Sequence, residues 1–301
     1  MLTSNLGDTE GALEAMQSGL VIAESLLAQE PLNPMYRQNL AIGYGETGRV
    51  CFNDGRIAEA LDYYRRALAI GEGVVRENPT SPFSRRELAV QHRNVGAALL
   101  KGGDKVEALN HFRQAIGIFE KLMEEDPKDA RMRRSSGYGY RDLAEALAAN
   151  GEAAEAEKNF NIALSIFEDA AAKDPKNRIP MSEQALTHLK MSRFFLGAGD
   201  LPRARSSAER ALTMAQEIAA RDANDVNARK AVAEVHEQLG QCAESGAKTP
   251  GDSAQACVSY RQSADIWREL RGKGKFNRAD AKKLADVESA LARCETEVAA
   301  R

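Results

Sequence analysis

The stretch ALDYYRRAL, residues 60–68, decides the fold. Its apolar letters fall at i, i+1, i+4, i+7 and i+8, which is the spacing of one face of an α-helix. The same pattern recurs in residues 108–116 and 156–164. Strict alternation of apolar and polar residues, the mark of a half-buried strand, is absent over five or more residues. The sequence therefore predicts an all-α protein.

A period of 48 residues runs through the whole chain. Four series of positions share this period, and the interval across residues 247–251 lengthens to 52. Such self-similarity indicates supersecondary units that stack on one another. The four series are Gly7, Gly55, Gly103, Gly151, Gly199 and Gly251; Asn33, Ser81, Asp129, Asn177, Asp225 and Asn277; Pro31, Pro79, Pro127 and Pro175; and Ala12, Ala60, Ala108, Ala156, Ala204 and Ala256.

The series have separate physical roles, several of them at helix ends. The glycines suit the residue after a helix, where the backbone turns left-handed without a Cβ penalty. The aspartates that follow four of them, and the Asn/Ser/Asp series, suit N-caps, and Pro34 and Pro82 suit the first helical position. Each unit is therefore predicted to be two helices of about 18–22 residues joined by tight turns. The four aspartates are Asp8, Asp104, Asp200 and Asp252.

The period divides the chain into a series of helix pairs. We expect about twelve helices in a single domain over residues 1–301, because each unit buries its apolar face only against its neighbours. The last helix is expected to cap the array. The predicted divisions are a half repeat over 1–32, full repeats over 33–80, 81–128, 129–176, 177–224 and 225–276, and a capping helix over 277–301.

The composition excludes several classes of protein. The chain has 301 residues, of which 43% are hydrophobic and 28% charged, the balance of an ordinary folded protein. Its net charge of -3 gives no reason to expect nucleic acid or anionic lipid as partner. No apolar run approaches the ~20 residues that a membrane span needs, and the start lacks the features of a signal peptide.

The helix pairs resemble the tetratricopeptide repeat (TPR) family. That motif places a ring and then a small residue in the first helix, followed by Ala, a ring and Ala in the second. The repeat 33–80 carries Tyr44, Gly48, Ala60, Tyr64 and Ala67 at these positions. Small residues let the backbones approach, and the rings fill the remaining space. The resemblance implies a right-handed, TPR-like α-solenoid that binds proteins in its concave groove and is no enzyme.

A second resemblance concerns the long repeat. The stretch AIGIFEKLMEEDP, residues 115–127, and the closing stretch 256–294 resemble the TPR regions that follow the kinase domain in some bacterial receptor-like serine/threonine kinases. The usual TPR repeat has about 34 residues, so both helices are longer here. This resemblance implies a scaffold or sensory segment of a larger signalling protein, and an extracytoplasmic location; a soluble cytoplasmic chain is otherwise expected. No kinase motif is present.

Two motif-like patterns have a structural explanation. Residues 43–48 spell G-x-G-x-x-G, but a dinucleotide site needs this motif between a strand and a helix, and the period places it inside a helix. His92, His188 and His236 share one position in separate repeats, roughly 20 Å or more apart, which zinc–nitrogen bonds of about 2 Å cannot bridge. We therefore expect no catalytic residue, no metal and no cofactor.

Cations and amides recur on the first helix of each repeat, where TPR proteins usually hold extended peptides. We hypothesise that this groove binds an acidic or phosphorylated peptide through charge-assisted hydrogen bonds. The sign reverses in the repeat 225–276 at Glu234 and Glu237. The alternatives are a solvated face without ligand, a self-association module, and, from another class, a helical enzyme domain. The candidate partner-binding residues are Arg49, Asn53, Arg93, Asn94, Arg141, Lys190 and Arg193.

The four cysteines are too few for a disulfide scaffold. Cys51 takes a core position and is expected to be a buried thiol. Cys257 and Cys294 lie on neighbouring helices at registers expected to face each other, so they could form a disulfide. Cys242 is a nearby competitor, and three reduced thiols are the alternative.

The predicted helix within residues 8–30 lacks the first helix of its repeat. Ala12, Met16, Ala23 and Leu27 are expected to lie exposed there. We predict that the polypeptide continues upstream, or that two copies form a homodimer through this end.

Arginines also recur with the period near the start of each first helix. We expect them to run along one edge and to pair with the acidic ends of neighbouring helices. They are Arg37, Arg85, Arg133 and Arg229.

Overall fold

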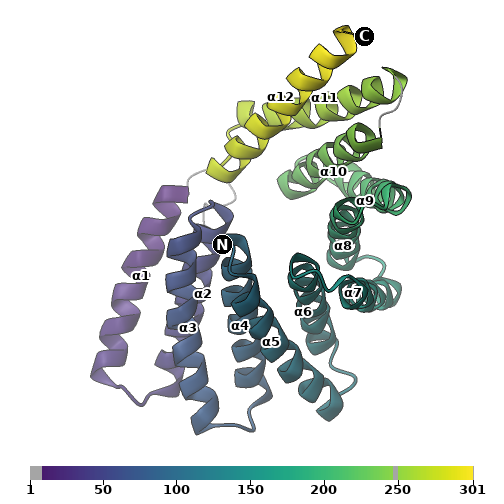
Figure 1. The fold of residues 1–301 in the computed structure, drawn as a ribbon. Coiled ribbons are helices and arrows are strands. Elements are labelled where there is room, and N and C mark those ends of the chain that lie inside the picture. The colour runs from purple at the N-terminus through teal and green to yellow at the C-terminus, as the bar shows by residue number, and fades with distance from the viewer. Residues whose placement is uncertain (1–8, 247–249, 301) are drawn as a thin grey trace. The chain divides into compact units, whose positions relative to one another are not determined.

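The computed structural model describes residues 9–246 and 250–300. Twelve α-helices and no strand occur among these residues (Figure 1). Consecutive helices pack on one another through short turns, so the predicted all-α solenoid of antiparallel helix pairs is confirmed. The helices are α1 (Thr9–Gln29), α2 (Pro34–Asn53), α3 (Ile57–Glu77), α4 (Pro82–Gly102), α5 (Lys105–Glu125), α6 (Ala130–Ala149), α7 (Ala153–Lys173), α8 (Arg178–Gly197), α9 (Leu201–Arg221), α10 (Val226–Gly246), α11 (Pro250–Gly272) and α12 (Arg278–Ala299).

The chain forms two compact units, Met1–Ala163 and Leu164–Arg301, and the boundary lies inside α7. In the first unit each helix from α1 to α6 packs on the next, and α4 also contacts α2 and α6. In the second unit α8 to α12 pack in the same way, and α8 contacts α10. We call the even-numbered helices A helices and the odd-numbered ones B helices. The single domain predicted over residues 1–301 stays a prediction.

The predicted helix ends are confirmed at most positions. Gly55, Gly103, Gly151 and Gly199 have φ between +76° and +98°, a conformation that glycine adopts without a Cβ penalty. Eight of the predicted N-cap residues accept a hydrogen bond from a backbone amide of the helix that they cap. They are Asn33, Ser81, Asp104, Asp129, Asn177, Asp200, Asp225 and Asn277.

The prediction fails at the long interval. Gly251 and Asp252 lie in the first turn of α11, because this helix already begins at Pro250. Proline is favoured at the first position of a helix, where its missing N–H removes no hydrogen bond. The inserted residues therefore shift the helix start relative to the glycine series. Gly7 and Asp8 lie outside the described residues.

In the α2–α3, α4–α5 and α10–α11 pairs, a ring of the B helix packs on a glycine of the A helix, whereas the α8–α9 pair has Ala208 in place of the ring. A Cβ added to Gly48 would lie 2.7 Å from the ring of Tyr64, and one added to Gly240 would lie 2.6 Å from the ring of Tyr260. Both rings are buried. The motif residues thus do in the structure what the resemblance implies: they allow two helices to approach closely.

The arginine series pairs as predicted in three repeats. Arg37 forms an ion pair with Glu77, Arg85 with Glu125, and Arg229 with Glu269. Each pair joins the start of an A helix to the end of its B helix. Because the carboxylates are exposed, each pair stabilises the fold by only ~0–1 kcal/mol.

The structure corrects the residues expected to be bare on α1. Ala12 is 1% exposed, and Ala23 and Leu27 pack against the cluster that contains Leu40 and Tyr44 of α2. Met16 is half-buried as well. These residues lie on the side of α1 that faces the following A helix, so α2 covers them. Other apolar side chains are exposed instead, namely Val21, Ile22 and Leu26.

Candidate protein-binding faces of the A helices

In the first unit, a cluster of charged and aromatic side chains joins α4 to α6. Arg93 Nε donates to Asp142 Oδ2 at 2.9 Å, and its guanidinium lies 5.3 Å from the ring centroid of Tyr138. The guanidinium of Arg141 lies 5.6 Å from the same ring. Such cation–π contacts attract a cation to the face of the ring. The cluster holds two candidate arginines in fixed positions on neighbouring A helices.

The other candidates of the first unit differ in exposure. The Arg49 side chain is 50% exposed and donates to Glu46 from Nε and Nη2, at 2.9 and 2.7 Å. Asn53 is exposed one turn later on α2, and Asn94 is half-buried beside Arg93 on α4. Arg141 is buried. Arg49 and Asn53 are therefore the candidates that a partner can reach most directly.

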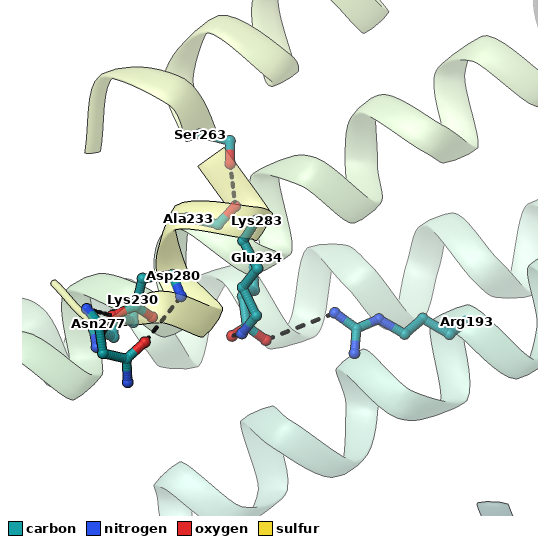
Figure 2. A network of polar contacts seen from close by, with 8 residues as sticks. All are labelled: Arg193, Lys230, Ala233, Glu234, Ser263, Asn277, Asp280 and Lys283. Carbon is teal, nitrogen blue, oxygen red and sulfur yellow. Dashed lines mark hydrogen bonds and ion pairs between the residues drawn. The ribbon is translucent and has the colours of Figure 1, made fainter. Parts of the chain in front are cut away.

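In the second unit, cations from α8 and α12 surround a carboxylate of α10. Arg193 Nη2 lies 3.6 Å from Glu234 Oε2, and Lys283 Nζ donates to Glu234 Oε1 (Figure 2). Burial acts to raise the pKa of Glu234, but Lys283, Arg193 and Lys190 outweigh it and hold that pKa below its ordinary value. Glu234 is therefore ionised at neutral pH, and the candidates Lys190 and Arg193 lie beside a negative charge.

One turn along α10, Glu237 has a different environment. Burial raises the pKa of its carboxyl, while Arg193 opposes that rise. The face built by α8, α10 and α12 therefore carries both signs of charge at close range. The first unit has the same feature, because Arg49 pairs with Glu46 and Arg93 with Asp142.

A polar network fixes α12 against α10. Asp280 Oδ2 accepts from Lys230 Nζ at 2.6 Å and from the backbone N–H of Asn277 at 2.9 Å (Figure 2). The side chain of Asp280 is only 6% exposed. This network sets the position of Lys283, one turn further along α12, and hence the geometry around Glu234.

The cysteines and His92 are buried among packed helices. Cys257 and Cys294 form a disulfide with Cα atoms 5.6 Å apart, within the usual range. Cys51 is a buried thiol, as predicted, and burial raises its pKa to about 11. Burial lowers the pKa of His92 to about 4, so the ring is neutral at pH 7. The Nδ1 atom of His92 lies 3.0 Å from Nδ1 of His111. The sequence did not predict this contact with His111.

No group of three or more His, Cys, Asp or Glu side chains in residues 9–246 and 250–300 could hold a metal ion. Over the same ranges, no helix is both long enough and apolar enough to cross a membrane. A cleft of about 680 Å³ lies between α9 and α11, but its cations Arg229 and Lys273 both pair with its Glu269.

Comparisons with known proteins place this architecture. The crystal structure of BtubC (BKLC) from P. vanneervenii superposes with a TM-score of 0.61 at 16% identity, over 88% of this chain and 93% of that one. A kinesin light chain of Podosopora anserina with nearly identical TPR-like repeats gives a TM-score of 0.50 at 17% identity, over 78% and 97% of the two chains. The chain has a TPR-like repeat fold. The fold implied by the TPR resemblance of Tyr44, Gly48 and their repeats is thereby confirmed.

Two further comparisons concern the TPR-type repeats. Residues 38–187, a little under half of the chain, match the family model described as bacterial transcriptional activator domain. Rap protein complexed with competence and sporulation factor superposes with a TM-score of 0.51 at 16% identity, over 96% of this chain and 74% of that one. Likeness at these identities concerns the fold. No curated protein sequence matches the chain.

Proposed function

We propose that the TPR-type repeats are a protein-interaction scaffold that binds an acidic or phosphorylated segment of a partner on the A helices. One observation carries this proposal. Arg49 and Arg193 share a position in the period, and their side chains are 50% and 47% exposed on the A helices of the two units. Arg49 pairs with Glu46 and Arg193 with Glu234, and both guanidinium groups remain about half exposed.

The chemistry of arginine suits such a role. A guanidinium has five N–H donors in a planar fork, so one that already contacts a carboxylate has donors left for a second anion. Charge-assisted hydrogen bonds of this kind are about twice as strong as neutral ones. Within the first unit, the cluster of Arg93, Tyr138 and Asp142 would add to the contacts offered by Arg49. Asn53, Asn94, Arg141 and Lys190 complete the proposed contact set.

A regulatory setting within a larger signalling protein is part of the proposal. The similarity of residues 38–187 to a domain of bacterial transcriptional activators supports it, as does the resemblance to kinase-associated TPR regions. We propose no catalytic role, because the buried histidines and carboxylates described above are engaged in packing and ion pairs. A pocket that turned over a substrate would favour the helical enzyme domain instead.

The test is a binding measurement with defined probes. A library of fluorescein-labelled 12-residue peptides, either acidic or phosphoserine-containing, is titrated by fluorescence anisotropy at two salt concentrations. The double variant Arg49→Glu/Arg193→Glu should weaken the best binder at least tenfold, and salt should weaken binding to the unaltered protein, because the contacts are ionic.

A matched control keeps the same change in charge. Arg205 and Arg210 are exposed on the B helix α9, so Arg205→Glu/Arg210→Glu should leave the affinity within about twofold, as surface substitutions away from a site do. Equal losses in both double variants, or no binder in the library, would contradict the proposal. Circular dichroism of each variant checks that the helices remain folded.

A further inference from the structure

The cleft of about 680 Å³ between α9 and α11 has α10 as its third side. Its volume lies within the range of roughly 300–1,000 Å³ that is typical of small-molecule sites. The buried residues of its lining are Val232 and His236 of α10, which are 6% and 7% exposed. The Nδ1 atom of His236 is buried and has no hydrogen-bond partner among the described residues. Because buried polar atoms are nearly always hydrogen-bonded, this part of the cleft has hydrogen-bonding capacity that the chain itself does not use.

The lining residues recur every three or four positions on each helix, so they form three layers along the cleft. The first layer is uncharged, the second is mostly apolar and the third is charged. The first layer, which we call the amide layer, is Gln216, His236 and Gln262; the second is Ala219, Ala220, Val232, Asp265 and Ile266; the third is Ala223, Asn224, Arg229, Glu269 and Lys273.

The charged residues of the cleft are engaged in ion pairs away from the amide layer. Glu269 pairs with both cations of the third layer, Arg229 and Lys273. Asp265, the charged member of the second layer, pairs with Arg268 at 3.2 Å. The third layer lies two helical turns, about 10 Å, from the amide layer. The cleft therefore combines an uncharged polar end with an apolar middle.

The amide layer has a different composition from the same positions in the other repeats. Where the A helix carries tyrosine, its hydroxyl donates to a glutamate of the preceding B helix: Tyr140 Oη donates to Glu120 Oε1 at 2.9 Å, and Tyr44 Oη donates to Glu24 Oε1. The position of Gln216 holds glutamate in every earlier repeat, namely Glu24, Glu72, Glu120 and Glu168.

In the repeat of α10 the ring is shorter and the facing side chain is uncharged. His236 has no hydroxyl with which to reach across, and Gln216 has no charge. The space that the Tyr–Glu bond takes up in the other repeats therefore opens into the cleft, with the unpartnered Nδ1 of His236 beside it.

The side chains of the amide layer indicate the chemistry of a ligand. Burial lowers the pKa of His236, so its ring is neutral at pH 7 and has one donor and one acceptor. Gln216 and Gln262 each have a carbonyl acceptor and an NH₂ donor. A carboxylate or an ammonium entering this layer would lose its hydration without meeting an opposite charge there, which is costly. A carboxamide, which also donates and accepts, matches the layer.

We propose that this cleft binds a small uncharged molecule that carries a carboxamide beside a short aliphatic group. The carboxamide would bind in the amide layer, and the aliphatic group would bury apolar area against Val232 and Ile266. None of the residues proposed to contact an acidic peptide lines the cleft, so either proposal can fail without the other.

The probe is N-acetyl-leucinamide, an uncharged molecule with amide groups on both sides of an isobutyl side chain. N-acetyl-leucine, which has a carboxylate, and leucinamide, which has an ammonium, are the matched charged analogues. Binding is followed in the full chain by the nitrogen chemical shifts of its four histidine rings. We expect the neutral probe to shift the His236 signals to saturation and to leave those of His188 unchanged. Both charged analogues should bind at least tenfold more weakly.

Variants of the chain locate the site, with affinities measured by saturation transfer to the probe. The double variant Gln216→Glu/His236→Tyr rebuilds the pair that Glu120 and Tyr140 form, so it should fold, close the gap and weaken the probe at least tenfold. Gln262→Glu changes an exposed residue of α11 and should weaken the probe at least fivefold. Its matched control is Gln114→Glu, exposed at the same position of α5, which should leave the affinity within about twofold.

Three results would overturn the proposal. The first is an absence of any shift of the His236 signals up to the solubility limit of the neutral probe. The second is equal affinity for the neutral probe and its charged analogues. The third is an affinity that Gln216→Glu/His236→Tyr and Gln262→Glu both leave unaltered, which would place the binding elsewhere on the chain.

Discussion

The close approach of Gly240 to the ring of Tyr260 makes the Gly240→Ala variant a quantitative test of the packing. The new Cβ would lie 2.6, 2.7 and 2.9 Å from three ring atoms, and Tyr260 is only 1% exposed. Because a buried ring cannot swing away, the helices must separate or the ring must shift, at a cost of about 1–3 kcal/mol. Alanine gains about 1 kcal/mol over glycine in a helix. We therefore expect a net loss of about 0–2 kcal/mol, in place of the gain of about 1 kcal/mol expected at an unobstructed helical glycine.

The assay is urea unfolding followed by the fluorescence of Trp267, the single tryptophan, which is buried in the same unit. The control is Gly197→Ala, where an added Cβ meets no atom within 4 Å; it should be neutral or stabilising. A second variant with Tyr260→Leu should remove most of the Gly240→Ala penalty, since the two effects share one contact. A Gly240→Ala variant that is stabilised as much as Gly197→Ala would refute the reasoning.

Three more predictions concern the second unit. Reduction should lower its free energy of unfolding by about 4 kcal/mol, because the Cys257–Cys294 disulfide closes a loop with a sequence separation of 37; titration of the unfolded chain should find two thiols without reductant and four with it. Asp280→Ala should cost about 2–3 kcal/mol by urea unfolding, because it removes a cap and leaves Lys230 without its carboxylate; Asp280→Asn should cost less, and equal losses would contradict this. Burial lowers the pKa of His188 from 6.5 to about 4, so the unfolded state binds the proton first: stability should be full above pH 6.5 and fall as the pH drops toward 4. A urea midpoint that His188→Gln leaves equally dependent on pH across that window would contradict the His188 assignment.

The helix ends were predictable from sequence because they depend on neighbouring residues. An N-cap such as Asn33 bonds to amides two and three residues away, and a glycine such as Gly103 needs only its own left-handed backbone. The 48-residue period then repeated each signal several times. Where the period broke, at Gly251, the local signal of Pro250 decided the helix start instead.

The candidate site was less predictable, because its partners lie in another repeat. Arg93 was recognised, but Asp142, 49 residues away, and the ring of Tyr138 were not. A pattern of cations on a helix face does not show which carboxylates of the next A helix will orient them. The prediction of which apolar residues of α1 are exposed was wrong for a related reason. Ala23 and Leu27 were expected to be exposed, but they face the following helix and pack against it.

Hydrogen–deuterium exchange of the full chain, with and without its tightest-binding acidic or phosphoserine peptide, tests most directly whether the A helices hold the partner. We expect the peptide to slow exchange in α2 and α4 or in α8 and α10, where Arg49, Arg93 and Arg193 lie, and to leave the B helices α3, α5 and α9 unchanged. Slower exchange confined to the B helices, or no change anywhere despite saturated binding, would contradict the account.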